Sequence, residues 1–172
     1  NPTIPVSTIF LFSIPAPPPH HMSLSSMMLT PGVAGAVLLG HTALTKIMMT
    51  LIWRGPGSKA ESIPGFENNW FSVKDKIKKV PGYAIMSGTQ MNEAEYAPVL
   101  ISALLFCSLK NIDVPLASTL AVFGQIMYFW PRVLLASPSN FNNGFPFYVP
   151  GALARYASLF MLAWAIYQNV SA

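Results

Sequence analysis

The sequence predicts an all-α membrane protein, a bundle of four transmembrane helices. Hydrophobic residues make up 52% of the chain and charged residues only 9%, whereas a soluble domain carries about 25% charged residues. The apolar residues also fall in four long blocks, each of about 20 residues or more, which is the length that crosses the roughly 30 Å hydrocarbon core of a bilayer. Too little charge to cover a soluble surface and blocks of spanning length together favour the membrane class.

The chain divides into an N-terminal arm, residues 1–26, and a transmembrane domain, residues 27–172. The arm contains six prolines, and its apolar run at residues 8–14 is far too short to span a bilayer. We interpret it as an extended segment, partly polyproline II.

The first span is predicted at residues 27–53. Pro31 suits its first turn, where a missing N–H costs little, and Trp53 is typical of an interfacial anchor. A polar loop follows at residues 54–82 and contains five lysines. Within this loop, residues 70–80 have the pattern of a short amphipathic helix on the membrane surface.

The second span is predicted at residues 83–109, polar in its first half and apolar in its second. A tight turn at residues 110–113 leads to the third span, residues 116–136, which ends in aromatic residues and Arg132. An uncharged loop, residues 137–148, precedes the fourth span at residues 149–170, which has Arg155 near its start.

The lysines of the 54–82 loop indicate the orientation of the chain. The opposite short loop has only Lys110, and the arm has no lysine or arginine. The positive-inside rule therefore places the basic loop on the cytosolic side, or on the equivalent matrix or stromal side. No basic stripe interleaved with aromatics extends beyond this loop, so we expect no nucleic-acid partner.

Five ionisable residues within the spans fall in the half of the bundle near the basic loop: Lys46, Glu93, Glu95, Arg132 and Arg155. Intramembrane charges are costly and usually face a bundle interior or a wet cavity. One interpretation is a binding site. The other is structural: the cations extend to the interface, and Glu93 and Glu95 pair with the arginines.

Asn92, Glu95 and Tyr96 share one helix face, because residues three and four apart are neighbours on a helix. A carboxylate accepts a hydrogen bond from an ammonium group, and an amide both donates and accepts. This face is therefore a candidate binding site for a polar, peptide-like ligand.

The segment from Gln90 to Pro98, QMNEAEYAP, resembles the second helix of the MAPEG superfamily, the membrane-associated proteins in eicosanoid and glutathione metabolism. The family pattern there is Arg, three residues, Asn, two residues, Glu, two residues, Pro. Asn92, Glu95 and Pro98 match it, and Gln90 and Tyr96 are similar to the leukotriene C4 synthase branch. The four spans, the basic loop and Arg132 agree as well, so the resemblance covers about residues 27–170.

The resemblance implies a homotrimer of four-helix protomers in membrane lipid, with glutathione between neighbouring subunits near the cytosolic face. It implies that Gln90, Asn92, Glu95 and Tyr96 bind glutathione. Arg132 and Arg155 would be catalytic, stabilising the glutathione thiolate that attacks a lipophilic electrophile in a transferase or peroxidase reaction. The chain departs from the family at two positions: Gly88 stands where the family has its arginine, and Leu135 where an aromatic residue is expected.

A second hypothesis is a non-catalytic, MAPEG-like subunit of a larger photosynthetic or respiratory membrane complex, with the Pro-rich arm lying on a partner. The absence of the family arginine and the long arm favour it. A channel or transporter is a third interpretation, which four spans without an internal repeat argue against. The membrane could be that of the endoplasmic reticulum, the chloroplast or the mitochondrion.

His41 lies alone in the first span, and we expect a hydrogen-bonded core histidine or one facing a neighbour rather than a tetrapyrrole ligand. His20 and His21 are adjacent in the arm, and adjacent side chains on an extended chain point apart. We therefore predict no metal site.

Overall fold

The computed structural model describes residues 28–53, 81–135 and 145–171. Across these ranges the regular structure is entirely helical: α1 (Pro31–Trp53), α3 (Pro81–Leu109), α4 (Pro115–Leu135) and α5 (Phe145–Val170). This confirms the all-α prediction. The predicted arm, the amphipathic helix at residues 70–80 and nearly all of the basic loop lie outside the described residues.

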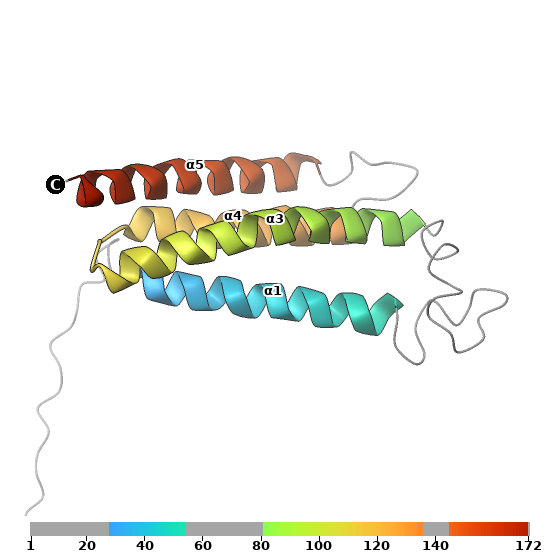
Figure 1. Cartoon of the computed structure of the whole chain (residues 1–172). Helices are drawn as coiled ribbons and strands as arrows, with labels where there is room; N and C mark the ends of the chain where they lie inside the picture. Colours follow the sequence, from blue (N-terminus) through green and yellow to red (C-terminus); the bar gives the residue numbers. More distant parts are fainter. Residues whose placement is uncertain (1–27, 54–80, 136–144, 172) are drawn as a thin grey trace, which may run out of the picture.

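Successive helices run antiparallel along a common direction (Figure 1). In that view α1 and α5 lie on opposite sides, with α3 and α4 between them. The most extensive packing is between α4 and α5, followed by that between α1 and α3, whereas α3 and α5 touch only locally. The bundle is therefore two tightly packed helix pairs, joined mainly through α3 and α4.

The starts of α1 and α5 differ most from the predicted ones, by four residues each. α1 begins at Pro31, later than the predicted residue 27, whereas α5 begins earlier than predicted. It begins at Phe145, four residues before the predicted start, so the loop prediction was wrong for residues 145–148. Pro146 lies in the first turn, where its missing N–H breaks no intrahelical bond. At the other end of the bundle, the turn that follows α3 contains Asn111. Its φ of 54° is left-handed, and asparagine tolerates this conformation at a helix end.

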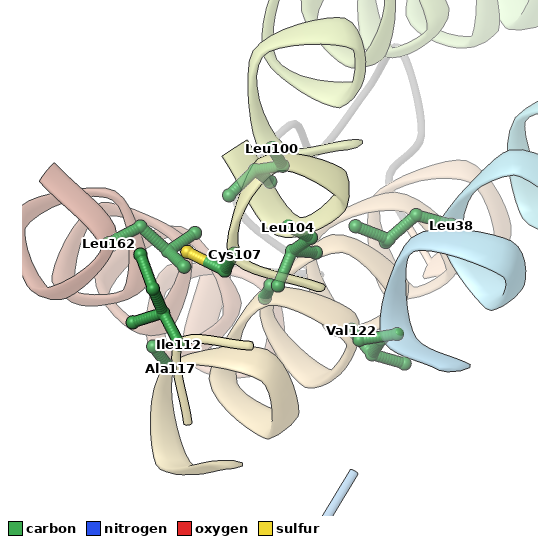
Figure 2. Packing of buried hydrophobic residues seen from close by; sticks show 10 residues of the cluster. Leu38, Leu100, Leu104, Cys107, Ile112, Ala117, Val122 and Leu162 are labelled. Atoms are coloured by element: carbon green, nitrogen blue, oxygen red, sulfur yellow. The ribbon is translucent and has the colours of Figure 1, made fainter. Parts of the chain in front are cut away.

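The main hydrophobic core lies in the half of the bundle that contains the α3–α4 turn (Figure 2). Side chains of all four helices meet there, and Cys107 is buried among them as a free thiol. The core residues labelled in Figure 2 are Leu38, Leu100, Leu104, Cys107, Ile112, Ala117, Val122 and Leu162. The buried polar side chains of α3 (Thr89, Gln90 and Glu93) and Arg155 of α5 lie in the other half, whereas Ser158 donates to the carbonyl oxygen of the core residue Ala117.

Two of the described helical segments are long and apolar enough to cross a membrane, Pro31–Ile52 and Phe145–Val170. Large apolar side chains such as Leu39, Phe160 and Trp164 point outward from them, each more than half exposed. Such outer faces are typical of helices that contact lipid. In α3 the polar residues between Ser87 and Glu95 interrupt the apolar pattern.

Candidate functional site

Two glycines bring the backbones of α4 and α5 into direct contact. A Cβ atom on Gly124 would lie 2.6 Å from the backbone nitrogen of Arg155, and one on Gly151 would lie 2.5 Å from the backbone nitrogen of Tyr128. Small residues allow helices to approach in this way. Arg155 therefore lies where the backbones of α5 and α4 touch, and its side chain is buried within the bundle.

Arg155 is 1% exposed, so the alternative in which the cations extend to the interface is wrong for this residue. Its guanidinium carbon lies 4.0 Å from the ring centroid of Tyr96 and 4.3 Å from that of Tyr128. The Nε and Nη1 atoms are buried without a hydrogen-bond partner, and no carboxylate among the described residues forms an ion pair with Arg155. Cation–π contacts supply about 2 kcal/mol when desolvated, far less than a buried unpaired charge costs.

The hydroxyls of Tyr96 and Tyr156 lie 3.0 Å apart, and their rings meet edge to face with centroids 5.6 Å apart. Tyr156 follows Arg155 in α5, and its ring centroid lies 5.7 Å from the guanidinium carbon. A guanidinium and two phenols from α3 and α5 therefore converge. We call Arg155, Tyr96, Tyr128 and Tyr156 the Arg155 cluster.

Arg132 joins the same cluster from the last turn of α4. Its Nη1 donates a hydrogen bond to the Tyr128 hydroxyl, and its guanidinium carbon lies 5.4 Å from the ring centroid of Tyr128 and 5.6 Å from that of Tyr148. The Tyr128 ring thus contacts both arginines. This arrangement concentrates positive charge where α4 ends and α5 begins, which is the electrostatic environment that an anionic ligand requires.

Among the described residues Glu93 pairs with His41 and not with an arginine, so the structural alternative is wrong for this residue. It is 1% exposed, and its Oε1 lies 2.7 Å from Nδ1 of His41 in α1. Thr45 Oγ1 lies 2.5 Å from Glu93 Oε2 and 2.9 Å from the Thr42 carbonyl oxygen. The hydroxyl has a single hydrogen, and the closer, charged acceptor is the stronger partner.

Gln90 belongs to this α1–α3 network as well, because its Nε2 donates to the Thr45 carbonyl oxygen at 3.1 Å. His41 is buried, as expected for a hydrogen-bonded core histidine, and its ring meets Phe129 edge to face with centroids 5.5 Å apart. The structure therefore engages Gln90 with α1 and not with the Arg155 cluster.

The other candidate residues on α3 differ in how far their side chains are exposed. Asn92 is half-buried, with Oδ1 buried and unpartnered, whereas Glu95 is exposed. Tyr96 is half-buried against α5. Of the six predicted site residues, the structure brings Tyr96, Arg132 and Arg155 together around Tyr128, with Asn92 and Glu95 on the same stretch of α3.

Tyr128 and Tyr156 were missed as site residues in the sequence. Tyr128 was noted only as an aromatic residue marking the end of a span. Tyr156 stands beside Arg155 in the sequence, and Gly151 precedes Arg155 by four residues, one helical turn. A glycine one helical turn before an arginine of a predicted span was the one local signal for these residues in the sequence.

An apolar groove of about 430 Å³ runs between α3 and α5, next to the cluster. Tyr156 forms part of its wall. The rest of the wall comes from Val99, Ala103, Leu159, Phe160, Leu162, Ala163 and Ile166. The Arg155 cluster is thus cationic inside and lies next to an apolar groove.

In the part of the chain that the structure describes, no three His, Cys, Asp or Glu side chains gather. Comparisons with protein-family models, with curated proteins and with solved structures gave no match.

Proposed function

We propose that this chain is a four-span integral membrane protein that binds glutathione at the Arg155 cluster, with the MAPEG-like chemistry of a glutathione transferase or peroxidase. The observation that carries the proposal is the buried Arg155 guanidinium with two unpartnered nitrogen atoms, Nε and Nη1. An uncompensated charge of this kind costs several kcal/mol. An anion that enters the cluster removes this cost, so the site favours a thiolate or carboxylate ligand.

Glutathione fits this chemistry better than a simple anion does. Its thiolate and carboxylates need cationic partners, which Arg155 and Arg132 supply, and its ammonium group needs an acceptor. Glu95 and the unpartnered Asn92 oxygen provide acceptors on the same stretch of α3. A lipophilic electrophile would lie in the adjacent groove between α3 and α5.

The exposed stripe of α3 supports the proposed assembly as a homotrimer. Its members are spaced alternately by four and three residues, as on one face of a helix that packs against another: Ala84, Gly88, Met91, Glu95, Pro98 and Ser102. Glu95 lies near the middle of the helix, where a carboxylate facing lipid is costly. Contact with a second copy of the chain would cover this stripe and leave Glu95 at a ligand site between subunits.

The experiment is glutathione titration of the detergent-purified protein, followed by binding heat and by thiolate absorbance. Arg155→Met should weaken binding at least about 30-fold, because truncating one partner of a buried charge pair costs 2 kcal/mol or more. Lys46→Met, which removes an exposed cation from α1, is the matched control and should bind normally. Lack of binding at millimolar glutathione would refute the proposal.

A second comparison tests the ligand-facing side of α3. Glu95→Ala should weaken glutathione binding more than Glu93→Ala does, measured per folded molecule, because Glu93 faces His41. Equal losses would contradict the assignment of Glu95 to the site.

The alternative function, a non-catalytic subunit of a larger organellar membrane complex, is favoured by Gly88. An added Cβ there would meet nothing within 4 Å, so no other side chain of the described residues lies against the position at which the family has its arginine. Under this alternative the protein would migrate with a large assembly on a native gel and would not turn over a halogenated aromatic substrate. Turnover by the isolated protein would exclude it.

A further inference from the structure

Tyr156 is placed to act on the ligand through Tyr96. The two hydroxyls are within hydrogen-bond distance at 3.0 Å, and the Tyr96 ring lies directly beside the Arg155 guanidinium, 4.0 Å from its carbon. Tyr156 itself is 40% exposed. Its ring is farther from the guanidinium, at 5.7 Å. Tyr96 is thus the inner member of the pair and Tyr156 the outer one.

The hydrogen bond between the phenols leaves one donor for a ligand. Each phenol has a single hydrogen, and one of the two is used within the pair. Neither hydroxyl has another hydrogen-bond partner among the described residues. If Tyr156 donates to Tyr96, the Tyr96 hydrogen is the free one, and a donor that also accepts a hydrogen bond is strengthened by it.

The sulfur is the part of glutathione that reaches this depth. Tyr148, which contacts Arg132, precedes Arg155 by seven residues in α5, about two helical turns nearer the end of the bundle. The Tyr128 ring contacts both guanidiniums, so they form one cationic site with an outer level at Arg132 and a buried level at Arg155. The carboxylates of glutathione are its most strongly hydrated groups and belong at the outer level, close to the end of the bundle. The less polar thiol enters the buried level, where Arg155 favours its thiolate form.

We propose, resting on the glutathione site above, that Tyr156 is a positioning residue: it donates to the Tyr96 hydroxyl and thereby directs the Tyr96 hydrogen to the glutathione sulfur. No covalent bond forms or breaks in the protein. On binding, the thiol proton leaves to solvent water, and the thiolate accepts hydrogen bonds from Tyr96 and Arg155. Tyr156 is therefore a determinant of thiolate recognition that touches the ligand only through another side chain.

The test compares glutathione with S-methylglutathione, which cannot form a thiolate. Tyr156→Phe keeps the ring contact and removes the hydroxyl. It should bind glutathione about 10- to 100-fold more weakly, the effect of one hydrogen bond to a charged group, and show less thiolate absorbance at saturation. Its affinity for S-methylglutathione should be unchanged. Tyr167→Phe, an exposed tyrosine farther along α5, is the matched control for both ligands.

A double-mutant cycle separates positioning from direct contact. Because Tyr156 acts through Tyr96, the Tyr96→Phe/Tyr156→Phe variant should bind glutathione no more weakly than Tyr96→Phe alone. Additive losses, equal losses for the two ligands, or no loss in Tyr156→Phe would each overturn the inference while leaving the glutathione site standing. If the unaltered protein binds neither ligand, the proposed function fails and the inference fails with it.

Discussion

Substituting alanine for Gly124 should separate α4 from α5 and disturb the Arg155 cluster. The added Cβ would lie 2.6 Å from the Arg155 nitrogen, 2.8 Å from the Gly151 oxygen and 2.9 Å from the Arg155 Cα. Ordinary contact begins at 3.4 Å, so the nearest contact is 0.8 Å too short. All three atoms belong to the backbone, and no rotamer change can relieve the overlap, so α5 itself must move.

The expected cost follows from two opposing effects. Overpacking of a well-packed interior costs about 1–3 kcal/mol, while replacing a helical glycine by alanine returns about 1 kcal/mol. Gly124→Ala should therefore lie between neutral and about 2 kcal/mol less stable. Gly40→Ala is the matched control, because a Cβ on Gly40 meets nothing within 4 Å, and it should gain up to about 1 kcal/mol.

Thermal unfolding in detergent, followed by circular dichroism, measures the difference between these two variants. Gly124→Ala should unfold at a lower temperature than Gly40→Ala, and it should also bind glutathione more weakly, because the displacement of α5 carries Arg155 away from Tyr128. A Gly124→Ala protein as stable as Gly40→Ala would refute the claim that the two backbones touch at this position.

Two further predictions concern buried polar groups. Gln125→Leu should raise the unfolding temperature, because Gln125 is fully buried with both amide atoms unpartnered and an unsatisfied polar group costs about 1–3 kcal/mol; a lower unfolding temperature in the same assay would show that the amide has a partner. Glu93→Ala should destabilise the fold by about 1–3 kcal/mol, because it leaves the buried His41 Nδ1 without its hydrogen-bond partner, whereas the exposed Glu95→Ala should not lower the unfolding temperature. Equal unfolding temperatures for these two alanine variants would contradict the network.

The helices were predictable because apolar blocks of spanning length are a local property of the sequence. The boundary of α5 was less accessible, since Pro146 and Pro150 suggest a loop as readily as a first helical turn. The wrong prediction for residues 145–148 arose there. Whether such prolines lie in a loop or in a first helical turn is decided by helix capping, and the capping depends on where the chain enters the bundle.

The division of polar residues between the two faces of α3 could not be derived from spacing alone. Asn92, Glu95 and Tyr96 are neighbours on any helix, but the rotation of α3 decides which neighbour each one meets. That rotation depends on contacts distant in sequence, such as Glu93 with His41, 52 residues away. For the same reason Tyr156 was missed, because its importance comes from Tyr96, 60 residues earlier.

The charge balance of the interior connects the two proposed functions. Both carboxylate oxygens of Glu93 are hydrogen-bonded within the chain, to His41 and Thr45, so Glu93 requires no ligand, whereas Arg155 has no carboxylate partner among the described residues. The favoured anion is glutathione, but in a non-catalytic subunit a carboxylate from a neighbouring protein would stabilise the same guanidinium. In both cases Arg155→Met should make the isolated protein more stable, since it removes an uncompensated buried charge. The two functions then diverge: Arg155→Met abolishes stabilisation by glutathione under the first, and weakens retention in the large assembly under the second.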